Sequence, residues 1–150
     1  MNIKADLNCP FCEILKRDPS RIIESRERFF VILSDPRLMP GHLLIIPRRH
    51  VQVPWEMPLG DHMIIVQAIM KYQKIIIDKI AEGCDVRQNY RPFIKDNPLA
   101  IKHLHWHLIP RDNKDKLYQE SMRHEDKVFA PPSSMELKQM MDIYRGVKPL

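Results

Sequence analysis

The chain has few cysteines and no long apolar run, with three cysteines among its 150 residues. It contains no uninterrupted window of 18 apolar residues, so we expect no membrane-spanning helix. Residues 1–8 carry two charges and no apolar run, so we expect no signal peptide. Without an export signal the cysteines do not suggest a disulfide framework, and we predict a cytoplasmic protein.

The chain also lacks a block of like charge, an internal repeat and a low-complexity segment. Basic residues exceed acidic ones, 24 to 19. This excess suits an anionic ligand, although an ordinary solvated surface explains it equally well, and we expect no specific nucleic-acid partner. A chain of this length suits a single domain with a real core, so we predict one domain over residues 1–150.

Three histidines alternate with apolar residues near position 105. On a strand, His103, His105 and His107 would line one face, while Leu104 and Trp106 would line the other. Burying three neutral imidazoles as mere packing would require up to six partners for their ring nitrogens. Imidazole can act as nucleophile, acid, base or metal ligand, so the pattern favours a chemical site over core packing.

Cys9 and Cys12 form a C-x-x-C pair near the start of the chain. The pair is compatible with a zinc site, a redox motif or coincidence. A redox pair is expected where a helix follows a strand, and here only eight residues precede the motif. Zinc would need two further ligands, and no neighbouring Cys or His within the next twenty residues supplies them.

The remaining pattern predicts an α+β fold, with an antiparallel sheet of about five strands, one long helix packed on it and a C-terminal helix. Four strands besides the histidine stretch are expected from β-branched and aromatic runs, at 21–24, 28–33, 42–46 and within 84–93. A hairpin at 25–27 would join the first two.

Helical periodicity extends over residues 58–82, and one short helical turn is expected at 12–17. The apolar side of the long helix is wide enough to contact a second subunit, although deep burial in its own monomer explains this equally well. Residues 112–116 and 127–132 are expected to be irregular. Ser133 and Glu136 form a capping box that opens a C-terminal helix ending near Gly146.

At residues 103–109 the chain resembles the histidine triad (HIT) superfamily, whose motif is His-φ-His-φ-His-φ-φ with φ apolar. The C-x-x-C pair, residues 40–51, Pro110 and Arg111 are similar to that family as well. The resemblance covers residues 9–112, which we take as the core, with 113–150 as a C-terminal extension. It implies a homodimer and a hydrolase or transferase that cleaves at the α-phosphate of a nucleotide.

The resemblance also implies roles for the histidines. His105 would be the nucleophile that forms a nucleotidyl-histidine intermediate, and His107 and His42 would contact the phosphate oxygens and assist the leaving group. A neutral imidazole attacks phosphorus well only if its far nitrogen keeps the proton, so a backbone carbonyl should hold that N–H.

Zinc-bearing members of the family further imply a closed structural zinc site. Its ligands here would be Cys9, Cys12, His50 and His103. The alternative is a metal-free protein in which His103 supports His105 through a hydrogen bond.

The chain departs from the family pattern around the substrate. Many members carry Gly-Gln-Ser or Gly-Gln-Thr before the triad, whereas this chain has Pro-Leu-Ala at 98–100. We expect Asn89 or Asn97 to replace those contacts, and Ser34 or Asp35 to bind the ribose. The substrate would be a dinucleoside polyphosphate, a nucleoside phosphoramidate or a similar adenine or purine nucleotide. Two alternatives remain, a nucleotide-binding module without turnover and a zinc-stabilised interaction protein.

Overall fold

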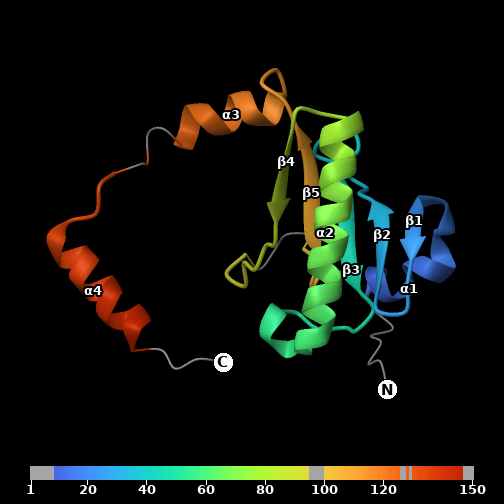
Figure 1. Ribbon diagram of the computed structural model, residues 1–150, viewed down its shortest axis with the longest axis horizontal. Helices are drawn as coiled ribbons and strands as arrows, with labels where there is room; N and C mark the ends of the chain where they lie inside the picture. The colour runs from blue at the N-terminus through green and yellow to red at the C-terminus, as the bar shows by residue number, and fades with distance from the viewer. Residues whose placement is uncertain (1–8, 95–99, 126–127, 129, 147–150) are drawn as a thin grey trace. The chain divides into compact units, whose positions relative to one another are not determined.

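The computed structural model describes residues 9–94, 100–125, 128 and 130–146 (Figure 1). The chain falls into two compact units that divide between Tyr118 and Gln119. The first unit holds the sheet, the long helix and the histidine motif. A single domain over residues 1–150 stays a prediction.

The first unit is built on a five-stranded sheet in the order β1-β2-β3-β5-β4, and every neighbouring pair is antiparallel. The predicted α+β fold class is therefore confirmed. The strands lie close to their predicted positions: β1 (Ile22–Ser25), β2 (Phe29–Leu33), β3 (Leu43–Pro47), β4 (Gly83–Arg87) and β5 (Trp106–Arg111). β5 lies between β3 and β4, so both of its edges are paired.

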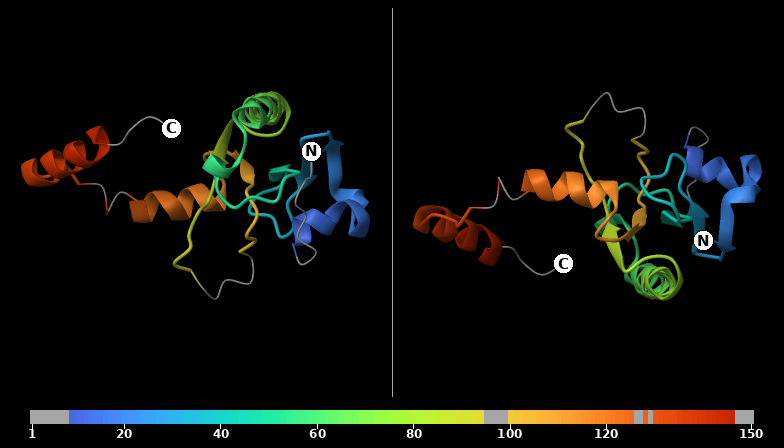
Figure 2. Two further views of the ribbon diagram at one scale, coloured as in Figure 1. Left: turned by 90° about the horizontal axis from the view of Figure 1, so that it is seen from below. Right: turned by 90° about the horizontal axis from the view of Figure 1, so that it is seen from above.

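Helix α2 (Leu59–Lys79) covers one face of this sheet (Figures 1 and 2). Its apolar residues Ile65, Ala68, Tyr72 and Ile76 recur every three or four positions and are buried. They belong to one cluster with inward strand residues such as Val31, Ile45 and Leu108. Burying each large apolar side chain stabilises the fold by roughly 1.5–3 kcal/mol, so this contact fixes the helix on the sheet.

Helix α1 (Pro10–Arg17) packs on the opposite face. Phe11 and Ile14 are buried against the strand residues that alternate with those under α2: Phe30, Ile32, Leu44 and Ile46. Pro10 stands at the first helical position, where its missing N–H costs nothing. Figure 2 shows that the segment after β4 also leaves the sheet on the side away from α2.

The histidine stretch differs from the prediction in its backbone. Strand β5 begins only at Trp106, so His103 and His105 precede it, and the prediction of one strand through all three was wrong. The Leu104 N–H donates instead to the Val51 carbonyl, 2.7 Å away in the loop after β3. The alternation of faces is nevertheless confirmed, because Leu104 joins the cluster under α2 while the histidines lie on the other side.

The described residues contain four further helical segments. Two short turns, η1 (Pro19–Arg21) and η2 (Pro54–Glu56), precede β1 and α2. Helix α3 (Lys116–Glu125) was not expected; it begins after Asp115, whose buried carboxylate accepts the Tyr118 N–H. Helix α4 (Ser134–Arg145) confirms the predicted capping, since the Glu136 N–H donates to the Ser133 hydroxyl. No described helix is long and apolar enough to span a membrane.

Candidate active site and metal centre

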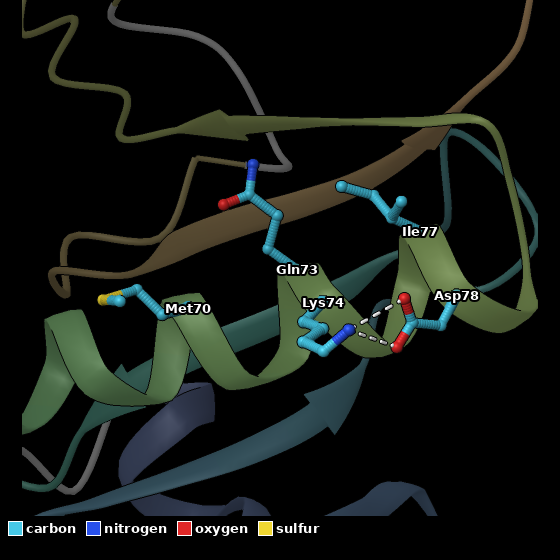
Figure 3. A pocket seen from close by; sticks show the side chains of 5 residues that line it. All are labelled: Met70, Gln73, Lys74, Ile77 and Asp78. Atoms are coloured by element: carbon cyan, nitrogen blue, oxygen red, sulfur yellow. Dashed lines mark hydrogen bonds and ion pairs between the residues drawn. The ribbon is translucent and has the colours of Figure 1, made fainter.

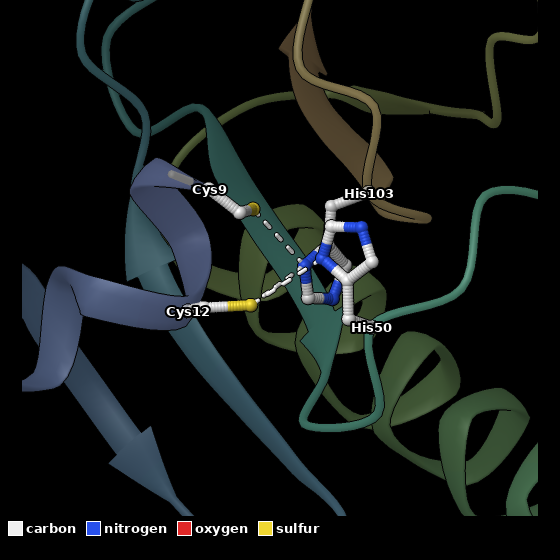
Figure 4. A group of neighbouring side chains, drawn as sticks. All are labelled: Cys9, Cys12, His50 and His103. Carbon is white, nitrogen blue, oxygen red and sulfur yellow. Dashed lines mark hydrogen bonds between the residues drawn. The ribbon is translucent and has the colours of Figure 1, made fainter. Parts of the chain in front are cut away.

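Two cysteines and two histidines converge between α1 and the sheet (Figure 4). Cys9 is the N-cap residue of α1 and Cys12 lies in its first turn. Both thiols therefore lie at the N-terminal end of the helix and point toward the two histidines. His50 follows β3 and His103 precedes β5. Their ligand atoms all lie within 4.8 Å of one another. The structure therefore brings together the four residues predicted as metal ligands.

The distances in this group fit a zinc ion. His103 Nδ1 lies 3.4 Å from Cys9 Sγ and 3.6 Å from Cys12 Sγ, and His50 Nδ1 lies 3.4 Å from Cys12 Sγ. Tetrahedral zinc with ordinary Zn–S and Zn–N bonds separates sulfur from nitrogen by about 3.5 Å. His103 Nε2 lies 2.9 Å from the Pro47 carbonyl, which can only accept. Nε2 thus carries the proton and Nδ1 keeps its lone pair for a metal.

The His105 ring is held in a defined tautomer. Its Nδ1 lies 2.6 Å from the His103 carbonyl oxygen, so Nδ1–H donates and Nε2 keeps its lone pair. This is the backbone carbonyl that the sequence analysis expected. Phe11 packs edge-on against the ring at 5.1 Å between centroids, and burial lowers the pKa of His105. His105 is therefore a neutral imidazole with one available nitrogen.

His42 and His107 form a directed hydrogen-bond chain. The Leu38 N–H donates to His42 Nδ1 at 3.2 Å, so the ring proton of neutral His42 is on Nε2. His42 Nε2 in turn lies 3.0 Å from His107 Nδ1 and donates to it. The proton of His107 is therefore on Nε2, and this N–H remains to donate. The centroids of the His105 and His107 rings are 4.8 Å apart.

Both members of this pair are neutral at neutral pH. Burial lowers the pKa of His42 to about 4, with smaller contributions from His105 and Arg87. Burial also lowers the pKa of His107 to about 3, assisted by His105, His42 and Arg87. Protonation of either ring would be costly, so at physiological pH the hydrogen bonds keep their donors and acceptors: Leu38 N–H donates to His42, and His42 donates to His107.

The predicted nucleotide-binding residues are more scattered. The Ser34 hydroxyl donates to the Pro36 carbonyl at 2.8 Å, and the Ser34 N–H donates to the His42 carbonyl at 2.9 Å. Asp35 is exposed, with a carboxylate oxygen 3.9 Å from Arg21. Asn89 is exposed two residues after β4, and Asn97 lies outside the described residues. Among the three of these residues that the structure describes, Ser34 is the one linked by a hydrogen bond to a histidine of the site.

Sequence reasoning missed two groups that shape the site. One is the Leu38 N–H, a backbone group that no residue pattern reveals. The other is Arg87, the last residue of β4, which lies directly opposite His107 in the sheet. Finding Arg87 would have required the register between β4 and β5, and the sequence does not specify this register because a long loop separates the two strands.

Three comparisons place these features among known proteins. The family model described as HIT domain matches residues 16–114. An adenosine 5′-monophosphoramidase of Saccharomyces cerevisiae is 32% identical over 118 residues, covering 75% of this chain and 68% of that protein. A HIT family protein from Bacillus subtilis aligns with a TM-score of 0.71 at 22% identity, covering 95% of this chain and 99% of that chain.

A zinc-bound histidine triad family protein from Mycobacterium smegmatis aligns with a TM-score of 0.63 at 26% identity. This alignment covers 77% of this chain and 88% of that chain. Its fold matches the sheet and helix described above. Because the family model spans well over half of the sequence, including all three histidines of the motif, this chain belongs to the HIT domain family.

Proposed function

We propose that the protein is a nucleotide hydrolase or nucleotidyl transferase that cleaves at the α-phosphate of an adenine or other purine nucleotide. The observation that carries this proposal is the tautomer of His105, whose Nδ1–H is held by the His103 carbonyl. Nε2 is thereby left as a nucleophile. The relative from Saccharomyces cerevisiae is described as an adenosine 5′-monophosphoramidase, which supports adenine nucleotides as substrates.

In the first step, the lone pair on His105 Nε2 attacks the α-phosphorus. A bond forms between nitrogen and phosphorus, and the bond to the leaving group breaks. The attacking ring becomes positively charged, and its Nδ1–H stays bonded to the His103 carbonyl, which stabilises that charge. His107 Nε2–H donates a hydrogen bond to the leaving group and keeps its proton, which stabilises the negative charge that develops there. A leaving group that needs a proton takes it from solvent.

In the second step, water or another acceptor attacks the nucleotidyl-His105 intermediate and restores the free imidazole. The attacking molecule releases its proton to solvent, and His107 stays neutral with its Nε2–H, so the site returns to its starting state. Both ring nitrogens of His42 are engaged, by Leu38 and by His107. We therefore assign His42 a positioning role instead of the direct phosphate contact expected from the sequence.

We propose that Ser34 and Asp35 bind the ribose, because the Ser34 backbone is hydrogen-bonded to His42 and so lies beside the site. Asn89 and Asn97 are proposed to contact the phosphates. Asn89 follows β4 on the segment that leaves the sheet opposite α2, the side on which the histidines lie.

We propose that Cys9, Cys12, His50 and His103 bind one zinc ion, supported by their donor set and spacing. Four protein ligands leave no open coordination position, so bound zinc would not activate substrate. It would connect α1 to the loop after β3 and to the segment before β5. His103 then has two structural contacts, the ligand contact through Nδ1 and the Pro47 carbonyl through Nε2–H.

We also propose a homodimer through the outer face of α2. Leu59, Met63, Val66 and Met70 repeat every three or four residues there and are exposed. A shallow hollow of about 400 Å³ continues this stripe, lined by Met70, Gln73, Lys74, Ile77 and Asp78 (Figure 3). A continuous apolar stripe on a helix suits association with a second copy. The predicted cytoplasmic location stays a prediction.

The test uses His105→Asn in a quenched single-turnover experiment with an adenosine 5′-phosphoramidate. Wild-type protein should trap an acid-labile nucleotidyl adduct, and His105→Asn should form none while still binding adenosine monophosphate. His62→Asn is the matched control, because His62 lies on α2 at the other face of the sheet. Turnover by His105→Asn within tenfold of wild type would overturn the nucleophile assignment.

A further inference from the structure

Arg87 stands beside His107, the proposed hydrogen-bond donor to the leaving group. Residues directly opposite in an antiparallel pair point to the same face, and Arg87 pairs with His107. Leu44 pairs with His107 from the other side, on β3. His107 is thus flanked by one apolar and one cationic neighbour, and Arg87 is the last residue of its strand.

The guanidinium of Arg87 can turn to a ligand without leaving a carboxylate unpaired. Arg87 Nη2 donates to Asp85 at 2.5 Å, and Arg111 donates to the same carboxylate oxygen. The Arg111 side chain is well buried and is also held by Asp115. Asp85 therefore keeps a partner when Arg87 moves. The Arg87 side chain is 40% exposed, so breaking its ion pair costs little.

Arg87 also supplies a charge that the histidines lack. His42 and His107 are neutral at neutral pH, and the Arg87 charge contributes to lowering the pKa of both. A polyphosphate leaving group carries several negative charges, and charge-assisted bonds from a guanidinium to phosphate are strong. An in-line displacement puts the leaving group on the side of phosphorus away from His105, and the group proposed to donate a hydrogen bond to it is His107.

We propose that Arg87 binds the leaving group when that group is itself a phosphate, so that the site prefers dinucleoside polyphosphates to nucleotides with an uncharged leaving group. This inference rests on the proposed function and names its substrate class.

The test compares two substrates, diadenosine tetraphosphate and an adenosine 5′-phosphoramidate whose leaving group is an uncharged amine. In Arg87→Gln, kcat/KM for the tetraphosphate should fall by about ten- to a hundredfold, the range expected for one lost charge-assisted bond, while the phosphoramidate changes less than about threefold. Arg87→Lys should recover part of the loss because it restores the charge. Lys79→Gln, which removes one charge at the end of α2, should change neither.

Equilibrium binding gives a readout that does not need turnover. Wild-type protein should bind ATP more tightly than AMP, and Arg87→Gln should lose most of that preference. Equal losses for both substrates, or an unchanged ATP preference in Arg87→Gln, would overturn the inference while leaving the proposed function intact. Absence of both turnover and a His105 adduct in wild-type protein would instead overturn the proposed function, and the inference with it.

Discussion

Two pairs of histidines lie on the same side of the sheet and contact different partners. His50 and His103 face two thiols, whereas His42 and His107 face each other along a chain that starts at a backbone N–H. Burial lowers the pKa of His103 to about 4, much as it does for His42. His42 and His103 are therefore alike in residue type, in burial and in the direction of the pKa shift. The partner of the second ring nitrogen decides whether an imidazole is suited to bind metal or to donate a hydrogen bond.

The largest expected effect comes from removing one thiol beside the His50 and His103 pair. Cys12→Ala should lose the bound zinc and about 3 kcal/mol or more of stability, lowering Tm by roughly 10 °C, because metal binding contributes folding free energy. Metal analysis and thermal unfolding with and without chelator measure this. Cys84→Ala is the matched control, since Cys84 lies on β4 and outside the Cys/His group. Zinc retained at one ion per chain in Cys12→Ala would contradict the ligand assignment.

A second prediction separates the members of the other pair. His107→Ala should lower kcat by about a hundred- to thousandfold, because it removes the proposed hydrogen-bond donor to the leaving group. His42→Ala should lower it less, because His42 acts through His107. Removing His42 also admits water, so the pKa of His107 should rise towards its ordinary value. The acid limb of the pH–rate profile should then shift to higher pH; an unshifted profile would argue against the positioning role.

The pair also predicts how stability depends on pH. The folded-state pKa values of His42 and His107 are about 4 and about 3, below the ordinary 6.5. Between the folded-state values and 6.5, the unfolded chain therefore binds more protons than the folded protein. The free energy of unfolding should be greatest above pH 6.5 and fall as the pH decreases towards 4. Glu24, whose pKa is lowered from 4.5 to about 2 by hydrogen bonds from Lys71 and Tyr72, loses its contribution as the pH falls from about 4.5 to about 2.

Denaturant titrations from pH 7 to pH 5 measure this slope. The double variant His42→Gln, His107→Gln should show a shallower slope than wild type, because two of the groups that gain protons on unfolding are gone. An equal slope in the double variant would show that other groups set the pH dependence in this range.

A substitution on the outer face of α2 should have the smallest effect on the two histidine pairs. Met70→Glu should halve the mass measured by light scattering, because it places a charge in the proposed dimer stripe. Its zinc content and its pH-dependent stability should stay unchanged, since α2 lies on the other face of the sheet from the histidines. A wild-type mass of one 17.8 kDa chain would remove the dimer proposal.

Much of the fold follows from local pattern. The period of the apolar residues in α2, the apolar runs of the strands and the capping box of Ser133 each specify an element from neighbouring residues. The extent of β5 did not follow, because a strand ends where its partner ends. Leu104 pairs with the loop after β3 instead of with a strand. Helix α3 was missed because Asp115, which caps it, reads locally as part of a polar loop.

The sequence by itself determined which side chains carry chemistry: three histidines at period two, two more beside basic and apolar residues, and a C-x-x-C pair. Successive side chains of an extended chain point to opposite faces, so the sequence alone places the three alternating histidines on the face opposite their apolar neighbours. Only the tertiary structure decided what each ring nitrogen contacts. Those partners are the His103 and Pro47 carbonyls, the Leu38 N–H and the thiols of Cys9 and Cys12. Since backbone groups are the same at every residue, and cross-strand register depends on the whole sheet, no local pattern specifies them.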